Sequence, residues 1–305
     1  PPRSTLDRSS AASDVYKRQL IDNAESYLCE LKQSQIRTGL HILGVNLSMD
    51  KLIELTLAIS NVPTGNIAGL SQCLAEDLGF TIDPWRDEES LDLTQIDINL
   101  FKEYTSINAR KVGQLIDWFN EIGMYIIEFH CIHILNLETT AKNKIELDSK
   151  LLKYLDIENP NIFINHLITN ILPRLLKSSK NEKTNLLKAL EGKRIASGPS
   201  GAPTRGKLEV LPTGKNFFSV DIRAIPTETA WDLGKRSAEK LVDLYLQENG
   251  EHLLHLAISI WGTSTMRNGG EDICQLFALM GLMPIWDGTL RRVVDVEVIP
   301  MSVLN

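Results

Sequence analysis

The sequence has few cysteines, no long apolar run and no excess of positive charge, and each lack excludes a class of protein. Its 4 cysteines stand far apart without a CxxC pair, which excludes a disulfide scaffold and a cysteine zinc site and favours the reducing cytoplasm. No apolar run reaches the roughly 18–20 residues that a transmembrane helix needs. The net charge of −7 leaves no basic excess to neutralise phosphate, so nucleic acid is not an expected partner.

The rest of the composition is typical of a folded globular protein, with 43% apolar and 23% charged residues. A length of 305 residues allows two domains. Residues 1–19 are Ser-, Arg- and Pro-rich without apolar periodicity, and we interpret them as a non-native, adapter-like segment. Residues 292–305 read as a strand that runs into a loop. We therefore expect an internal fragment of a larger multidomain subunit, truncated at its C-terminus and inactive by itself.

Residues 20–191 read as a helix-rich region. Apolar residues at helical spacing predict helices over 49–60, 66–79, 101–137, 145–156, 161–171 and 182–191. Gly79 is expected to end the second of these helices, and Pro173 to end or kink a later one. The acidic stretch 81–97 reads as a solvated loop.

Residues 192–305 read as a truncated α/β core. A Gly- and Pro-rich stretch over 197–217 predicts loops. After it we expect, in order, a helix from Thr227 to Gly250, a buried strand over 256–261, a Gly-rich loop over 262–270, a helix over 271–280 and strands over 283–287 and 292–299. This alternation predicts a mainly parallel sheet, so the fold class is α/β preceded by a helix-rich region.

Two familiar patterns fail in this sequence. Gly214 and Lys215 could belong to a Walker phosphate loop, but Asn216 replaces its Ser or Thr and Glu209 replaces its first Gly, so ATP binding is not expected. His130 and His133 share a helix face without the third or fourth ligand that a metal needs. His252 and His255 would lie on opposite faces of a strand, so a shared metal is not expected there either.

The segment 261–272 is the sharpest candidate site. It follows the carboxyl end of the predicted buried strand and opens a helix, at the edge where open α/β sheets bind ligands. Its amides could hold an anion, Arg267 adds a charge, and Glu271 lies in the first helical turn, where the helix dipole stabilises a carboxylate. The alternative is a tight turn with Glu271 as a helix cap, and the two remain equally open.

His41 lies between two glycines that interrupt a helical pattern, so its ring could project from a turn. Functional residues often sit on turns, although a lone histidine is more often structural. Both interpretations stay open on these residues alone.

Four blocks of the chain resemble one family. They are 37-RTGLHILG-44, 192-GKRIASGPSGAPTRGKLEVLPTGKNFFSVDIRAIPTETAW-231, 261-WGTSTMRNGGEDI-273 and 283-MPIWD-287. In order and spacing they resemble the large subunit of cobaltochelatase, which is similar to the H subunit of magnesium chelatase. The resemblance is strong over about 190–305, weaker over 20–80, and favours the cobalt branch because of 197-SGPSGAPTRG-206 and the residues after Gly262.

The resemblance implies a chelatase that inserts a divalent metal into a tetrapyrrole at the expense of ATP. The substrates would be Co²⁺ and a corrinoid precursor of the hydrogenobyrinic acid a,c-diamide type, and separate AAA-type partner subunits would hydrolyse the ATP. Metal entry requires a base near the ring centre, polar groups for the ring periphery and an apolar wall. The base or metal-relay candidates are Glu271 and His41, and the candidate macrocycle-binding residues are Trp261, Gly262, Thr263, Arg267, Gly270, Lys215 and Asn216.

Two alternatives remain beside this function. One is insertion of Mg²⁺ into protoporphyrin IX by a magnesium chelatase H subunit. The other is a non-catalytic α/β module that binds a tetrapyrrole or a nucleotide. Metallated product on addition of partner ATPases would distinguish a chelatase from such a module.

Overall fold

The computed structural model describes residues 41–64, 67–105, 107–136, 149–217, 222–287 and 292–300. The chain divides into two compact units, residues 1–42 and residues 43–305, and nearly all described residues belong to the second. The predicted adapter-like segment 1–19 lies outside the described residues. The predicted boundary after residue 191 falls at the end of a long helix inside the second unit, and the domain division stays a prediction.

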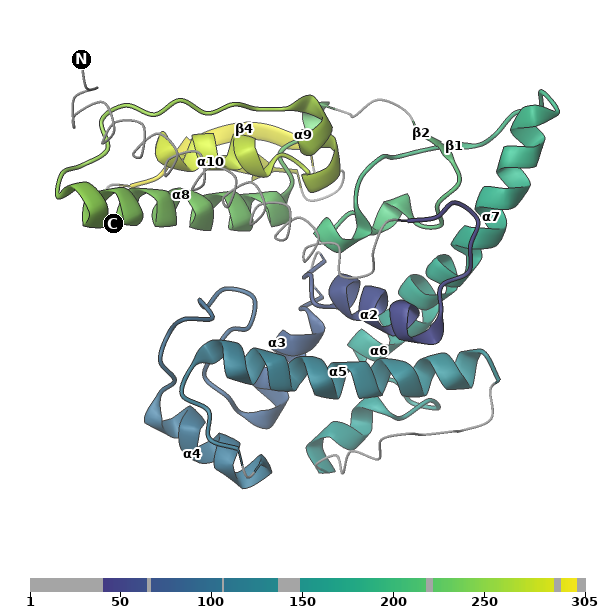
Figure 1. The fold of residues 1–305 in the computed structure, drawn as a ribbon, viewed down its shortest axis with the longest axis horizontal. Helices are drawn as coiled ribbons and strands as arrows, with labels where there is room; N and C mark the ends of the chain where they lie inside the picture. Colours follow the sequence, from purple (N-terminus) through teal and green to yellow (C-terminus); the bar gives the residue numbers. More distant parts are fainter. Residues whose placement is uncertain are drawn as a thin grey trace, which may run out of the picture. The chain divides into compact units, whose positions relative to one another are not determined.

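The first part of the second unit is helical (Figure 1). Its described helices are α2 (Met49–Ser60), α3 (Leu70–Leu78), α4 (Gln95–Tyr104), α5 (Val112–Ile134), the 3-10 helix η1 (Ser149–Tyr154), α6 (Ile162–His166), the π-helical turn η2 (Leu167–Ile171) and α7 (Leu172–Leu190).

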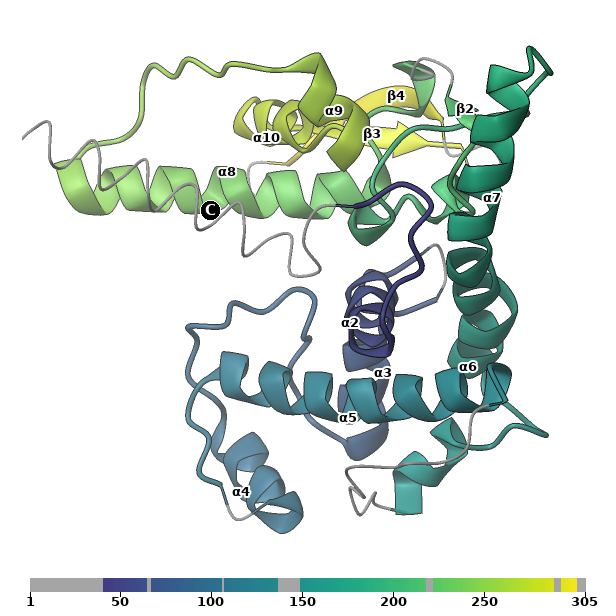
Figure 2. The ribbon, with the colours of Figure 1, turned by 45° about the vertical axis from the view of Figure 1, so that its right-hand side comes forward.

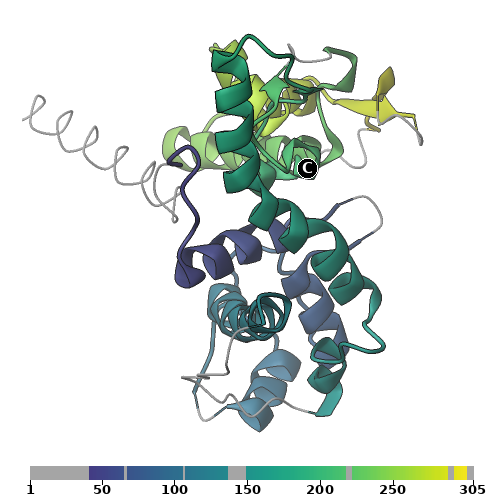
Figure 3. The same cartoon turned by 90° about the vertical axis from the view of Figure 1, so that its right-hand side faces the viewer.

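Helix α5 is the centre of the helical core, and α2 and α3 both pack on it. Figure 3 views α5 nearly end-on, with the other helices around it. Leu115, Phe119 and Ile126 of α5 are fully buried. A Cβ at Gly123 would lie 2.8 Å from the Leu57 side chain and 3.0 Å from that of Leu70. Glycine at this position therefore lets α2 and α3 approach α5 closely.

The helices at 49–60 and 70–78 confirm the predictions for these segments, and Gly79 ends the second with a φ of 88°. The single long helix over 101–137 was wrong at its start. Thr105 is extended after α4, and α5 begins only at Val112. In the intervening loop the Leu93 amide donates to the Arg110 carbonyl at 2.8 Å and the Val112 amide to the Leu91 carbonyl at 3.0 Å. These contacts replace the helical hydrogen bonds of the broken segment.

Pro173 lies in the first turn of α7, directly after the π-helical turn η2. Proline lacks an amide hydrogen and crowds the preceding turn, so a helix that contains it departs locally from α geometry. The chain accordingly passes from α6 through η2 into α7 and stays helical. The sequence located the irregularity correctly, but no helix ends there.

The second part of the unit mixes helices with short strands, which agrees with the predicted α/β class. Its described elements are β1 (Ser197–Gly198), η3 (Pro203–Arg205), η4 (Leu208–Val210), β2 (Asn216–Phe217), η5 (Ile222–Ala224), α8 (Glu228–Asn249), α9 (Gly262–Asn268), α10 (Glu271–Leu279), β3 (Leu282–Trp286) and β4 (Val293–Val298). The pair β1–β2 is parallel and the pair β3–β4 is antiparallel.

Three expectations for this part were wrong in detail. Residues 256–261 are not a strand: among the described residues they have no ladder partner, and periodicity cannot show whether a partner is present. Most of the predicted loop 262–270 is the helix α9, because only Gly269 and Gly270 have the positive φ that interrupts a helix. The sheet formed by β3 and β4 is antiparallel, because the six residues between the two strands are too few for the crossover that a parallel pair needs.

Helices α8 and α10 lie side by side, as Figures 1 and 2 both show. Helix α8 begins after Thr227, whose side chain accepts a hydrogen bond from the Ala230 amide, and ends at Gly250 as predicted. At the contact, a Cβ on Gly234 would lie 2.6 Å from the Glu271 carbonyl oxygen. The close packing at Gly234 therefore fixes the start of α10, where Glu271 stands.

Candidate functional site

Glu271 is the first residue of α10, and its side chain is 21% exposed. The Arg205 guanidinium, from the Gly- and Pro-rich loop, donates from Nη1 to Glu271 Oε1 at 3.1 Å. One carboxylate oxygen is thus held by a fixed cation. This arrangement orients the carboxylate before any ligand binds.

Burial raises the pKa of the Glu271 carboxyl, the Arg205 charge counteracts this rise, and Asp272 adds to it. A carboxyl group with a raised pKa is a better proton acceptor near neutral pH than an exposed glutamate. Glu271 therefore combines a carboxylate oriented by Arg205 with a raised pKa, and both suit a general base.

Asn268 caps the start of α10. Its Oδ1 accepts hydrogen bonds from the Gly270 amide at 3.0 Å and the Glu271 amide at 3.4 Å. Gly269 and Gly270 have φ values of 79° and 98°, which bring Asn268 back to these amides. The hydrogen bonds to these amides therefore come from Asn268 and not from the Glu271 side chain, and a functional role for Glu271 stays a prediction. The same two amides are also occupied, so the expected anion site on them is not supported.

The sequence reasoning missed the contacts that the segment 202–207 makes with Glu271 and with α9. Besides Arg205, the nearly buried Lys207 donates from Nζ to the Met266 carbonyl of α9 at 3.1 Å. Burial lowers the pKa of the Lys207 ammonium. The Ala202 amide also donates to the Arg267 carbonyl at 3.2 Å. In the sequence, Arg205 and Lys207 are two cationic residues in a Gly- and Pro-rich stretch, and this pattern alone predicts no role for them.

The candidates in and before α9 are more exposed. Trp261 is 68% exposed and precedes α9 as its N-cap residue. Thr263 and Arg267 are exposed on α9, and a Cβ at Gly262 would meet nothing within 4 Å. Gly270 is the opposite case, because a Cβ there would lie 2.7 Å from the Ile225 side chain. The exposed residues are available to a ligand, whereas Gly270 has a packing role.

Lys215 and Asn216 lie near the end of the Gly- and Pro-rich stretch 197–217. Asn216 begins β2, and its amide donates to the Ala196 carbonyl at 3.0 Å. The Lys215 ammonium donates to the Glu209 carbonyl at 3.3 Å, and its aliphatic stem packs over Gly198. No contact joins either residue to Glu271 in the described part of the chain, so their convergence on one ligand stays a prediction.

Glu182 of α7 connects two of the resembling blocks. It is 2% exposed and accepts a 2.6 Å hydrogen bond from the Gly44 amide and another from the Thr213 hydroxyl. The Ser179 hydroxyl donates to the Gly44 carbonyl at 2.9 Å. One buried carboxylate therefore holds the turn after His41 next to the loop that leads to Lys215. The sequence alone offered no signal for this role.

His41 is exposed and belongs to the unit of residues 1–42. Its convergence with Glu271 stays a prediction. His130 is buried, and its Nε2 donates to the Tyr154 carbonyl at 2.7 Å, so it is a core residue. Among the described residues, no group of three or more His, Cys, Asp or Glu side chains could hold a metal ion.

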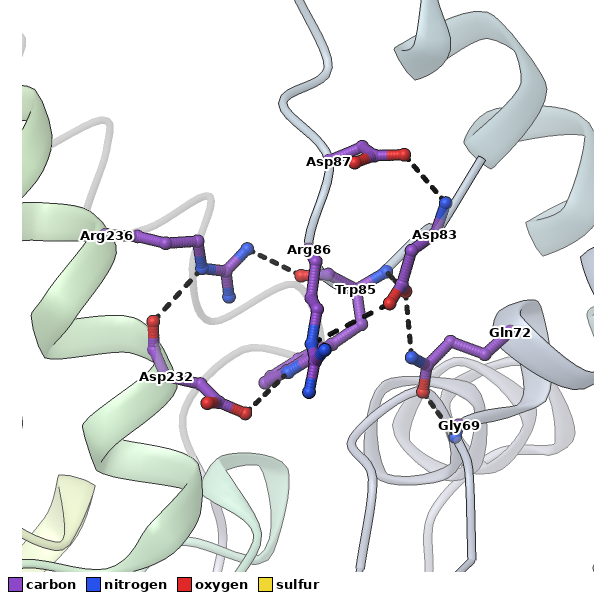
Figure 4. Close-up of polar contacts among 8 residues, drawn as sticks. All are labelled: Gly69, Gln72, Asp83, Trp85, Arg86, Asp87, Asp232 and Arg236. Carbon is purple, nitrogen blue, oxygen red and sulfur yellow. Dashed lines mark hydrogen bonds and ion pairs between the residues drawn. The ribbon is translucent and has the colours of Figure 1, made fainter. Parts of the chain in front are cut away.

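A polar network joins the acidic loop after α3 to α8 (Figure 4). The Arg236 guanidinium lies 5.3 Å from the centre of the Trp85 ring and donates to the Trp85 carbonyl at 2.5 Å. The Trp85 indole donates to Asp232 at 3.4 Å. On the loop side, Asp83 accepts from the Trp85 amide at 2.9 Å. These contacts anchor α8, and α8 in turn packs against the helix that carries Glu271.

Comparison with known proteins identifies the class to which this arrangement belongs. The sequence model of the CobN/Magnesium Chelatase family matches residues 4–305. The aerobic cobaltochelatase subunit CobN of Pseudomonas aeruginosa is 38% identical over 289 residues, which are 93% of this chain and 22% of that protein. The chloroplastic magnesium-chelatase subunit ChlH of Oryza sativa subsp. japonica is 27% identical over 307 residues, 94% of this chain and 20% of that protein.

A solved structure gives the same result. The catalytic subunit of cobaltochelatase from Mycobacterium tuberculosis matches 87% of this chain and 20% of its own, with a TM-score of 0.58 and 29% identity. The chain therefore belongs to the CobN/Magnesium Chelatase family. It spans about one fifth of the length of these relatives, which agrees with the expected part of a larger subunit. No helix in the described ranges is long and apolar enough to cross a membrane.

Proposed function

We propose that this chain is part of the tetrapyrrole-binding catalytic subunit of a cobaltochelatase, and that Glu271 acts in metal insertion. The observation that carries the proposal is the half-buried Glu271 carboxylate, held by Arg205 with its pKa raised by burial. Insertion needs a group that accepts pyrrole protons or passes the metal to the ring. Arg205 holds one carboxylate oxygen of Glu271, and in this proposal the other oxygen takes part in this step.

The proposed substrates are Co²⁺ and a corrinoid precursor of the hydrogenobyrinic acid a,c-diamide type. Three exposed residues precede Glu271 in the sequence, namely Trp261, Thr263 and Arg267. In this proposal they offer an apolar wall and polar groups to the ring. His41 remains the second candidate for the metal-relay or base role. Lys215 and Asn216 remain candidates for the ring periphery.

In this proposal ATP is hydrolysed by AAA-type partner subunits, and the whole complex works in the cytoplasm. The failed Walker pattern around Gly214 supports this division. In the structure Gly214 packs its backbone against α7, where a Cβ would lie 2.7 Å from the Glu182 backbone. A packed glycine of this kind does not form an open phosphate loop.

Magnesium chelation is the second candidate function. The identity of 27% to the rice ChlH subunit over almost the whole chain supports a shared fold and reaction type. The identity of 38% to the Pseudomonas CobN subunit favours cobalt. Competition between Co²⁺ and Mg²⁺, with each macrocycle in turn and the full-length subunit, decides between them.

The test of the proposal is Glu271→Gln in the full-length subunit with partner subunits, ATP, Co²⁺ and macrocycle. We expect macrocycle binding to stay nearly unchanged, because glutamine keeps the size and a hydrogen-bonding oxygen. Insertion should fall by roughly 10²-fold or more, the usual effect of losing a general base.

The matched control is Glu248→Gln, which makes the same chemical change at an exposed position near the end of α8. It should leave insertion close to that of the unsubstituted subunit. Normal insertion by Glu271→Gln would remove Glu271 from the mechanism and move the proposed role to His41. No metallated product from the unsubstituted complex would instead favour the non-catalytic binding module.

A further inference from the structure

Residues 252–261 form an apolar segment without regular secondary structure. In Figures 1 and 2 the segment is an extended connection from the end of α8 to the start of α9. Within the described ranges, its amides make no backbone hydrogen bond and its residues belong to no sheet. Apart from the Trp261 carbonyl, which accepts from the Thr265 amide, its peptide groups are therefore available for pairing with another chain segment, as in an edge strand.

The side chains of this segment point to two faces that differ in polarity. In an extended chain successive side chains alternate, so Leu254, Leu256, Ile258 and Ile260 share one face. Of these, Leu254 is 83% exposed, Leu256 45% and Ile260 42%. The other face is mixed, with His255, Ala257 and Ser259. One face is thus entirely branched and apolar, and most of it is open to solvent.

The sheet formed by β3 and β4 also leaves apolar side chains exposed. Val296 and Val298 share one face of β4 and are 40% and 71% exposed, and Val294, the unpaired residue where the ladder register shifts, is 61% exposed. The hydrophobic cluster of this region contains only Ala230, Trp231, Cys274 and Ile299 as buried members in the described part of the chain. Apolar side chains that are exposed in such numbers normally contact another protein layer.

We propose that, in the full-length subunit, residues 254–260 are an inner β-strand that pairs with a strand from the part of the subunit outside residues 1–305. The same part covers the face formed by Leu254, Leu256 and Ile260. Two observations support this occupant. This chain matches only 22% and 20% of the length of two relatives, and free peptide groups select a strand because only a strand satisfies them in series. This inference does not depend on the chelatase function.

Amide hydrogen exchange in the full-length subunit, without substrates or partner subunits, tests the proposal. Exchange of the amides in residues 254–260 should be slowed about 10³-fold or more relative to an unstructured peptide, as in core strands. The protection should persist on dilution of the monomeric subunit. Fast exchange overturns the proposal, and so does protection that disappears on dilution, which would indicate a second copy as the occupant.

A pair of substitutions at Ser259 adds an independent readout. Ser259→Pro removes one amide hydrogen from the predicted ladder, so protection of the flanking amides should fall at least 10-fold. Ser259→Ala keeps the amide and should leave protection unchanged. Equal protection in the two variants overturns the proposal. The unsubstituted subunit decides the question where the proline variant does not fold.

Discussion

At the scale of single residues, a few buried polar side chains determine where the functional segments lie. Arg205 orients Glu271, Asn268 caps the helix that carries it, and Glu182 holds the turn after His41. None of these three was a candidate in the sequence, because each acts on a residue distant along the chain or on backbone amides. The sequence did identify Glu271 itself, since a carboxylate after a Gly-rich segment in a helical first turn is a local pattern.

Glu182→Ala should lower the free energy of unfolding by about 2 kcal/mol, because the Gly44 amide and the Thr213 hydroxyl would lose their buried acceptor. The midpoint of urea unfolding measures this change. Glu191→Ala is the matched control, since Glu191 at the end of α7 makes only an exposed ion pair with Lys193 at 2.6 Å. Equal midpoints for the two variants would contradict the role of Glu182.

His130 predicts sensitivity to acid. Burial lowers its pKa below the usual 6.5, and the neutral ring donates to the Tyr154 carbonyl. Between the folded-state pKa and 6.5, the unfolded chain therefore binds more protons than the folded one, so stability falls as the pH is lowered through this window. His130→Gln should unfold at urea midpoints that differ less between pH 7.5 and pH 5.5. The exposed His252→Gln should keep the pH dependence of the unsubstituted chain.

At the scale of elements, the sequence located most helices and failed where an element depends on a distant partner. Helices α2, α3, α8 and α10 were predicted within a few residues, because their apolar spacing and glycine stops are local signals. The strand over 256–261 was wrong, since an apolar run cannot show whether a neighbouring strand exists. The break before α5 was missed because the loop there is held by Leu91 and Leu93, about 20 residues away.

The contact between α8 and α10 determines the position of Glu271. Gly234→Ala places a methyl group 2.5 Å from the Cys274 side chain and 2.6 Å from the Glu271 carbonyl. Such overpacking should cost about 1–3 kcal/mol of unfolding free energy and separate the helices. The melting temperature measures the loss. Ser237→Ala, on the exposed face of the same helix, should be neutral or slightly stabilising. A neutral Gly234→Ala would show that the two helices can separate without cost.

At the scale of the whole molecule, burial is unevenly distributed. The helical core contains an extended cluster of buried side chains centred on α5, whereas the region of α8, α10 and β3–β4 has few. The chain spans about one fifth of its relatives' length. The resemblance to the family could be seen in the sequence, but which surfaces remain open could not, because exposure depends on the packing of the complete fold.

The uneven burial predicts how residues 1–305 behave in isolation. Leu254, Leu256 and Val298 are between 45% and 83% exposed, so the isolated chain should bind a hydrophobic dye such as ANS and self-associate at micromolar concentration. The full-length subunit, at the same molar concentration, should bind several-fold less dye. Leu254→Ser together with Leu256→Ser should reduce dye binding by the isolated chain, whereas Lys177→Ser on α7 should not. A monomeric isolated chain with a cooperative melt and no dye binding would show that these side chains need no cover.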